Sequence, residues 1–250
     1  MKHVKTIISS LSPLITVVML FCIMEAAVRV FKIPYYVLPS PFLSLKYIIT
    51  DFNQMSPHLF KTFKEYFIGY PIGSAIGILL ALLFTISRLV NKAVSPYLTI
   101  LYCTPMLVLV PLLKIWLGVT AAVSVVVCAL SCFGATLTQT ITGAVSIPLE
   151  RIELIQTCKG SKLQQFFFIT IPSVWPSIFT GLKLGSISGL AGVIAAEMIG
   201  DKEGIGFMIR LCSYVYQMKE MFAYAYVLMA FGFLIYTIIS SLEGRLIRSE

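Results

Sequence analysis

The segment that decides how this chain is organised runs from Ile147 to Pro172 and reads IPLERIELIQTCKGSKLQQFFFITIP. It is polar, charged and compatible with helices, whereas the chain on each side of it is a long apolar run. A polar segment between two apolar runs is the kind of surface that a membrane protein offers to a soluble partner. We refer to residues 147–172 as the polar segment.

Composition places the chain in a lipid bilayer. Hydrophobic residues make up 58% of the chain and charged residues 12%, and the mean hydropathy of +0.92 is above the range of ordinary soluble domains. A membrane-spanning helix needs about 20 mostly apolar residues. Suitable runs lie near residues 8–30, 60–86, 94–113, 116–142, 178–199 and 222–241. The sequence thus predicts an all-helical, polytopic transmembrane bundle of about six spans, with a single domain over residues 1–250.

The first apolar run is expected to remain in the mature protein as a helix. Glu25 and Arg29 follow its apolar part, and no small-residue cleavage site of a signal peptide is evident. The two residues are four positions apart, which puts them on one face of a helix. We therefore expect an intrahelical ion pair between them.

Other classes of protein fit the composition poorly. The net charge is +8, but the basic residues are scattered, so we expect no nucleic-acid partner. The six cysteines lie mostly in apolar runs without the spacing of metal or disulfide sites, which favours packing roles. His3 and His58 are far apart and outside the spans, so they provide no intramembrane metal centre.

The polar segment is predicted to begin with a short amphipathic helix. Pro148 suits a first helical turn, where its missing N–H costs nothing, and Glu150 suits the positive helix end. The apolar residues recur every three positions and form a narrow stripe, which consists of Leu149, Ile152 and Ile155. Such a helix suits a position across a groove of a partner.

The end of this helix is predicted at Gly160, because glycine enters the left-handed backbone region freely. Lys159 complements the negative helix end. A second helical stretch is expected from Phe166 to Ile171, and Pro172 and Pro176 are expected to end it.

An alternative for the polar segment stays open at this point. The segment would then rest on the lipid headgroups as a connector without a protein partner, held there by its lysines and by Phe166, Phe167 and Phe168. Both alternatives predict the same helices, so the order of the residues has to separate them.

The order of residues in the polar segment resembles the EAA signature of binding-protein-dependent ABC transporter permeases, in which a cytoplasmic loop helix docks into the ATPase subunit. Glu153, followed at the spacing of the signature by Ile169, Ile171 and Pro172, carries the resemblance.

The sequence departs from this signature at two places. Leu154 and Ile155 stand where the family usually has small alanines. Lys159 holds the family's glycine position, and a glycine follows one residue later at Gly160. These changes bear on the fine geometry of docking, because a bulkier helix and a shifted end alter which ATPase fits.

Further segments carry the same resemblance, in the same order along the chain. They are LPSP at 38–41, PMLVLVPLLKIWLG at 105–118, TGLK at 180–183 and AAEMIGDKEGIGFMI at 195–209. The resemblance covers almost the whole chain and points to the branch of permeases that import sulfonates, taurine, nitrate and certain vitamin precursors.

The resemblance implies a subunit of a type I importer in the plasma or inner membrane. Its expected partners are a second permease copy, a cytoplasmic ABC ATPase dimer and an external substrate-binding protein. Both termini are expected in the cytoplasm, together with a docking loop over residues 144–176. The residues expected to couple the permease to the ATPase are Pro148, Leu149, Ile152, Glu153, Gln156, Lys159, Gly160 and Pro172.

ATP hydrolysis is expected in another polypeptide, because no G-x-x-x-x-G-K-[ST] phosphate loop occurs in the chain. ATP and Mg²⁺ would be bound by the partner ATPase, so we expect no cofactor, metal site or catalytic residue here. Closure of the ATPases on ATP would move the docked helices around 148–160, and rigid spans would carry that movement to the pathway.

Two other classes remain as alternatives. A membrane-embedded enzyme would need acids, bases or metal ligands in the spans, and an ion-coupled secondary transporter would need several carboxylates near the midplane. Glu197, at the far end of the fifth run, is the acid of this kind that the sequence provides. We expect it either at the pathway or subunit interface, or near the outer membrane surface, where it reaches toward water or pairs with Lys202.

Prolines and glycines provide further candidates for the pathway or an interface. Pro105 and Pro111 in the third run predict either a bent helix beside the pathway or a helix boundary. The glycines at helical spacing along the fifth run are Gly181, Gly185, Gly189 and Gly192. This glycine face is expected to contact either the second permease copy or a helix of the same subunit.

The distribution of basic residues leans weakly toward a cytoplasmic N-terminus, with Lys61 and Lys114 counted as external loop charges. An amphipathic helix from Pro41 to about Met55, together with 200–220, is then the expected surface for the binding protein; a helix that caps the bundle has the same pattern. The resemblance suggests as cargo a small organic anion or a thiamine-type or riboflavin-type precursor.

Overall fold

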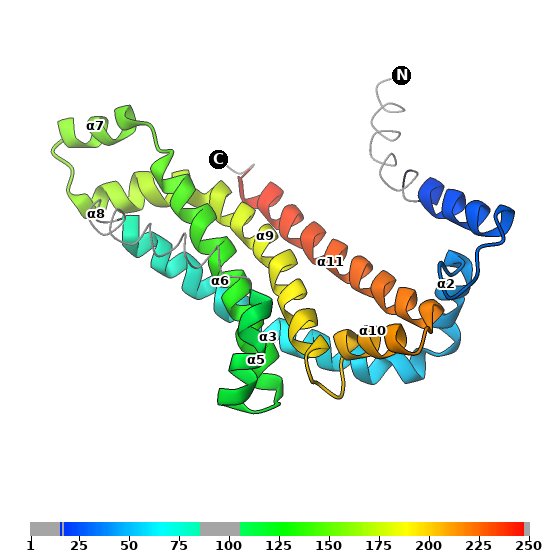
Figure 1. The fold of residues 1–250 in the computed structure, drawn as a ribbon. Helices are drawn as coiled ribbons and strands as arrows, with labels where there is room; N and C mark the ends of the chain where they lie inside the picture. Colours follow the sequence, from blue (N-terminus) through cyan, green and yellow to red (C-terminus); the bar gives the residue numbers. More distant parts are fainter. Residues whose placement is uncertain (1–15, 17, 86–105, 248–250) are drawn as a thin grey trace, which may run out of the picture. The chain divides into compact units, whose positions relative to one another are not determined.

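The computed structural model describes residues 16, 18–85 and 106–247, and the regular structure in these ranges is helical (Figure 1). Residues 18–30 form the first described helix. The later elements are α2 (Pro41–Thr50), α3 (Phe52–Thr85), α5 (Met106–Leu117), α6 (Ala121–Val145), α7 (Leu149–Thr157), α8 (Lys162–Gln165), the π-helix η1 (Phe166–Thr170), α9 (Ile171–Met198), α10 (Ile205–Tyr214) and α11 (Met218–Ile247).

Four described helices are long and apolar enough to cross a membrane, and they confirm the predicted helical bundle. They are Phe52–Thr85, Ala121–Val145, Lys162–Met198 and Met218–Leu246. Each contains one of the predicted spans or most of it. The other two predicted spans, 8–30 and 94–113, lie partly outside the described residues, which include helical residues 18–30 and the start of α5 at Met106.

The described residues fall into two compact units. One combines residues up to 58 with 208–228, and the other combines 59–207 with the residues from 229 onward. The single domain expected over 1–250 stays a prediction.

The first unit contains the predicted ion pair. Arg29 Nε lies 2.7 Å from Glu25 Oε1, which confirms the pairing expected from their spacing. Glu25 Oε2 also accepts hydrogen bonds from the Ser40 hydroxyl and from the Phe42 amide, so this carboxylate caps the start of α2. The helix expected from Pro41 to about Met55 is interrupted at Asp51, where the backbone leaves helical geometry and α3 begins one residue later.

The second unit is built around α6, which runs beside α9 (Figure 1). Glycines allow the close approach: a β-carbon at Gly73 of α3 would overlap the Ala129 carbonyl, and one at Gly189 of α9 would overlap the Cys132 sulfur. A β-carbon at Gly185 would come within 3.3 Å of a Thr136 methyl. The glycine face of α9 is thus filled by α6 of the same chain, which is the second of the two expected contacts.

The prolines of the third predicted span are only partly described. Pro111 lies inside α5 and does not end it, whereas Pro105 lies outside the described residues. The helix α5 packs against α6 and α9, with Val110 fully buried in a small apolar core beside Val123 and Ala196.

Candidate functional site

The polar segment folds as two helices joined by a tight turn. Its first helix, α7, begins at Leu149, directly after Pro148, and the Pro148 carbonyl accepts the amide of Arg151 at 3.2 Å. Glu150 lies in the first turn, where a carboxylate complements the positive helix end. The helix therefore starts where the sequence predicts.

The apolar residues of α7 divide into two groups. Ile152 and Ile155 are half-buried against their own chain, whereas Leu149 and Leu154 keep 59% and 67% of their surface exposed. Glu153, the first residue of the signature, is exposed on the same helix. The predicted stripe is thus partly used within the chain, and Leu149 is its exposed member, one helical turn before Glu153 on the same face.

The turn after α7 places its left-handed residue one position earlier than predicted. Lys159 has a φ of 55°, and the Gly160 amide donates to the Ile155 carbonyl at 2.8 Å. This bond is the six-to-one contact of a Schellman motif, in which the left-handed residue precedes the donor. The prediction that Gly160 provides the left-handed conformation is wrong, because Lys159 occupies the position that the family fills with glycine.

Gly160 has a different role in the same turn. A β-carbon there would lie 2.7 Å from Ile155 Cγ1 and 2.9 Å from the Ile155 carbonyl oxygen. The absence of a side chain therefore lets the chain fold back closely over the end of α7.

The second helix starts with a capping box that sequence analysis missed. The Ser161 hydroxyl accepts the Gln164 amide at 3.2 Å, and the Gln164 side chain accepts the Ser161 amide at 2.7 Å. The signal was present in the sequence as Ser161-x-x-Gln164, a pattern typical of helix starts.

Prolines do not end this second helix, contrary to expectation. The helix continues from Lys162 through α8, η1 and α9 to Met198. Pro172 has no amide to donate, and just before it the Ile171 amide bonds five residues back, to the Phe166 carbonyl. Pro172 occupies the first turn of α9, and Pro176 lies inside α9. The local π geometry thus lies directly before Pro172, whereas Pro176 lies within regular α-helix.

The two helices of the polar segment are also joined by a side chain. Arg151 of α7 donates a hydrogen bond from Nη1 to the hydroxyl of Ser173, near the start of α9, at 3.3 Å. Gln156, another of the coupling residues expected from the sequence, also lies on α7. The first helix is therefore linked to α9 both along the chain and across this contact.

A cluster of charged side chains lies at the opposite end of α9. We call it the Lys61 cluster, and its members are Lys61, Glu65, Lys114, Glu197 and Asp201. The Lys61 ammonium lies 2.8 Å from Asp201 Oδ2, 3.0 Å from the Glu203 carbonyl, 3.2 Å from Glu65 Oε1 and 3.8 Å from Glu197 Oε1. It thus sits among four oxygen atoms from α3, α9 and the turn that follows α9.

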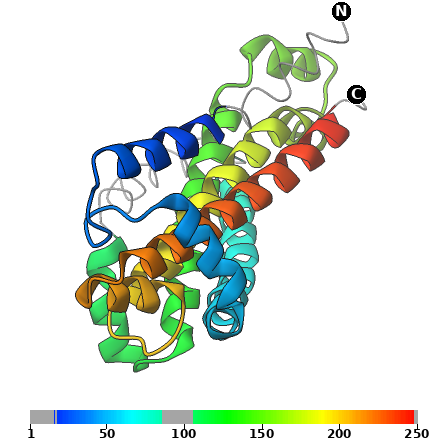
Figure 2. The same ribbon diagram turned by 90° about the vertical axis from the view of Figure 1, so that its right-hand side faces the viewer.

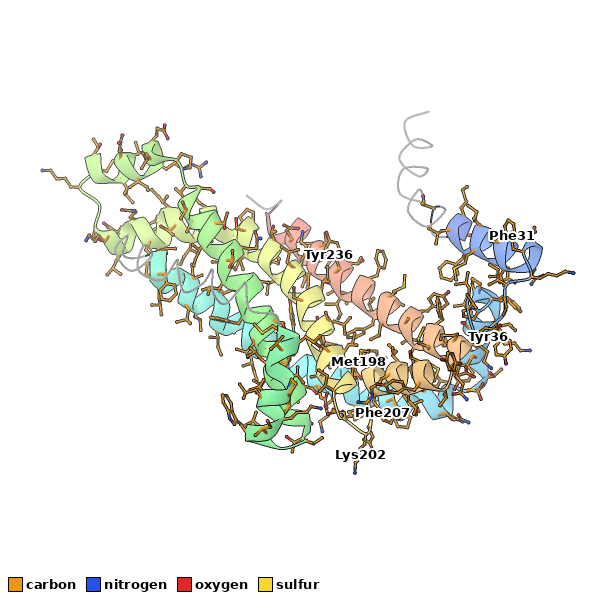
Figure 3. The ribbon with its side chains drawn as sticks, in the orientation of Figure 1. Phe31, Tyr36, Met198, Lys202, Phe207 and Tyr236 are labelled. Atoms are coloured by element: carbon orange, nitrogen blue, oxygen red, sulfur yellow. The ribbon has the colours of Figure 1, made fainter. Side chains whose placement is uncertain are left out.

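Glu197 is fully buried at the centre of this arrangement. Its Oε1 accepts the Thr62 hydroxyl at 2.7 Å, and its Oε2 accepts the Gly206 amide at 2.8 Å. Lys202, the partner considered from the sequence, is exposed. In Figure 3 its side chain points away from the helices; Met198 and Phe207 mark the neighbouring ends of α9 and α10. The pairing with Lys202 is therefore wrong, and so is a carboxylate that reaches toward water.

Asp201 connects the cluster to α5. It is buried and forms ion pairs with both Lys61 and Lys114. Sequence analysis counted both lysines as loop charges and so missed them. The available signal was their position at the edges of apolar runs, and it did not identify their partners.

An ion pair outside the Lys61 cluster joins α9 to α11. Lys183 on α9 pairs with Glu243 on α11, and its ammonium also lies 5.8 Å from the centre of the Tyr236 ring. The part of α11 after residue 229 runs beside α9 in both views (Figure 2). Lys183 ends the TGLK sequence noted above, so that sequence contributes to contact between helices.

Among the described residues, no group of three or more His, Cys, Asp or Glu side chains is placed to hold a metal ion. The cysteines described are free thiols, and Cys128 and Cys132 pack inside the second unit.

Comparison with known proteins gives relatives of one kind. The formylaminopyrimidine transport permease protein ThiX of Halalkalibacterium halodurans is 30% identical over 239 residues, which cover 95% of each chain. The taurine transport system permease protein TauC of Escherichia coli is 28% identical over 59% of this chain and 51% of its own length. The nitrate import permease protein NrtB of Synechocystis is 28% identical over 60% of this chain and 55% of its own.

A solved structure and a family model agree with these relatives. The crystal structure of an amino acid ABC transporter with histidines has a TM-score of 0.58 and 18% identity, and the match covers 82% of this chain and 98% of that chain, which shows a shared fold. The model of the binding-protein-dependent transport system inner membrane component matches residues 73–249. This match contains the whole polar segment and most of the spanning helices, and the chain therefore belongs to the family of binding-protein-dependent transport system inner membrane components.

Proposed function

We propose that this chain is the membrane-spanning subunit of an ABC importer for a small aminopyrimidine of the thiamine-precursor type. The observation that supports this cargo most directly is the 30% identity to a formylaminopyrimidine permease over 95% of both chains. The relatives named for taurine and nitrate match over 51% and 55% of their own lengths. A sulfonate, taurine or nitrate cargo is the alternative to be tested.

The proposed machine contains subunits that this chain does not provide. Two permease copies form the pathway, an ABC ATPase dimer binds ATP and Mg²⁺ on the cytoplasmic side, and a binding protein delivers cargo on the other side. With both termini in the cytoplasm, α7 and the turn at Lys159 face the ATPase. The chain itself transports and does not catalyse.

The surface of α7 supports an ATPase as its partner. Leu149 exposes more than half of its surface on a helix with a polar remainder, and Glu153 provides a charge one turn later on the same face. An amphipathic helix of this kind binds by laying exposed apolar side chains into a groove of the partner. The proposed groove belongs to the ATPase, and the coupling residues are those named from the signature.

A displacement of α7 would be carried into the membrane by rigid connections. The Schellman turn fixes the end of α7, and Arg151 contacts Ser173 at the start of α9. From Lys162 to Met198 the helix is continuous over 37 residues, a length of about 55 Å at 1.5 Å per residue. Movement of α7 would therefore reach the far end of α9 without passing through a flexible loop.

Matched glutamate variants test the docking step. The chain is co-expressed with a candidate ABC ATPase, and native, Glu153→Ala and Glu150→Ala forms are purified and reconstituted in lipid. Both glutamates are exposed on α7, so the two variants remove the same charge from the same helix. We expect Glu153→Ala to reduce the bound ATPase at least about tenfold, the loss of one charge-assisted contact, and Glu150→Ala to retain it.

The outcomes separate the alternatives for the polar segment. If the native chain binds no ATPase, or if both variants bind it as the native chain does, the segment is a connector resting on lipid. Cargo is tested in the same vesicles by the ATP hydrolysis that the binding protein stimulates when loaded with a formylaminopyrimidine, taurine or nitrate. Stimulation by taurine or nitrate alone would overturn the aminopyrimidine assignment.

A further inference from the structure

We propose that the Lys61 cluster is an ionic latch, which holds the turn at 199–204 closed against α3 and α5 and opens when the transporter is loaded with ATP. The inference rests on the proposed importer function for its trigger. Its structural basis is the arrangement of charges at the end of α9 that lies farthest from α7 along the continuous helix.

One ammonium group connects several elements of the fold. Lys61 on α3 reaches oxygens of Glu197 on α9 and of Asp201 and Glu203 in the turn after α9. Asp201 in turn pairs with Lys114 on α5. Separation of the turn from α3 would therefore break one ion pair and one hydrogen bond, and its separation from α5 would break a second ion pair.

Backbone amides at the start of α10 also hold the turn at 199–204 in place, through contacts with Thr62 and Glu197. Thr62 accepts the Ile205 amide at 2.8 Å while it donates to Glu197, and Glu197 accepts the Gly206 amide. Gly204 has a φ of 104°, and a β-carbon there would overlap the Glu197 carboxylate. The turn is thus shaped around this carboxylate, and closure brings all the contacts together at once.

The charges themselves indicate a function other than stability. Two ammonium groups face three carboxylates, and Glu65, Glu197 and Asp201 are all buried. Removing such groups from water costs several kcal/mol per ion, and a well-packed apolar cluster of the same volume is often as stable or more so. A buried network of this kind favours one closed arrangement, because partial separation leaves unpaired charges without water.

Water provides the route to a second stable state. Lys61 keeps 21% of its side-chain surface exposed, whereas Glu197 has none. Water that enters beside Lys61 would solvate the separated charges, so that the open state becomes stable once the joint is fully parted. The cluster therefore has the properties of a two-state element, closed and dry or open and hydrated.

Hydrogen exchange measures this opening directly. The peptide bond amides of Ile205 and Gly206 belong to the closed joint, so their exchange reports its opening. The native permease with its ATPase in lipid nanodiscs is compared without nucleotide and with a non-hydrolysable ATP analogue and Mg²⁺. We expect exchange in residues 200–207 to become at least about tenfold faster with the analogue.

Variants separate the latch from general flexibility. Lys61→Met should give fast exchange in 200–207 without nucleotide, whereas Lys202→Met, which removes a charge from the same turn, should exchange as the native chain does. Equal exchange of the native chain in both nucleotide states, while the ATPase is bound and active, would show a static brace and overturn the latch. Failure of the ATPase to bind at all would instead overturn the proposed function, so the two failures are distinguishable.

Discussion

The polar segment and the Lys61 cluster place the same kinds of charged side chain in opposite surroundings. On α7, Glu150 and Glu153 are exposed, and their removal leaves nothing buried without a partner. At the far end of α9, Glu197 is fully buried and depends on Lys61, Thr62 and the Gly206 amide. The first region thus presents its charges to its surroundings, whereas the second uses charge to close the chain on itself.

The largest expected effect comes from removing a charge from the buried Lys61 cluster. Lys61→Met removes the ammonium shared by Glu65, Glu197 and Asp201, and loss of one partner from a buried ion pair costs about 3–5 kcal/mol. We expect a clear drop in the midpoint of thermal unfolding in detergent. The exposed residue Lys202 provides the control, since Lys202→Met should leave the midpoint within about one degree of the native value, a change of no more than about 0.5 kcal/mol.

An intermediate effect is expected from Gly204→Ala. Its φ of 104° is unfavourable for alanine, and the added methyl group would meet the Glu197 carboxylate. Overpacking of this kind costs about 1–3 kcal/mol in addition to the backbone strain. Gly118→Ala is the control for backbone strain without overpacking. Gly118 has a φ of 76°, and an added β-carbon there would have its nearest neighbour 3.8 Å away. Equal denaturation midpoints for the two variants would contradict a turn shaped around the carboxylate.

The smallest expected effect has the opposite sign and lies in the polar segment. Lys159 adopts a φ of 55°, so Lys159→Gly should relieve left-handed strain of roughly 1 kcal/mol and stabilise the end of α7. Slower hydrogen exchange at the Gly160 amide would measure this gain. Lys162→Gly, in the first turn of α8, should show no such gain, and faster exchange in Lys159→Gly would show that the lysine side chain supports the turn.

Sequence reasoning succeeded where a feature depends on neighbouring residues. The spans follow from the length of apolar runs, the Glu25–Arg29 pair follows from a spacing of four, and the start of α7 follows from Pro148. Each of these rests on local rules that a single stretch of chain satisfies.

The same reasoning failed where partners are distant or where two local rules compete. Lys61 and Asp201 are 140 positions apart, so no periodicity announces their contact. Pro172 and Pro176 predicted a helix end, but the helix continues: one hydrogen bond shifts to five-residue spacing just before Pro172, and Pro176 lies inside α9. At Lys159 the turn requires a left-handed backbone, which lysine disfavours. The prediction was placed at Gly160 because glycine adopts that conformation more readily.

The π turn at Phe166–Thr170 also decides which way α7 faces. Such a turn holds one residue more than the α-helix needs for the same rise, and each α-helical residue rotates the chain by about 100°. The extra residue therefore sets the angle by which α8 and α7 are rotated about the axis of α9. A chain that lacked one of these residues would keep its membrane helices and present α7 toward another side.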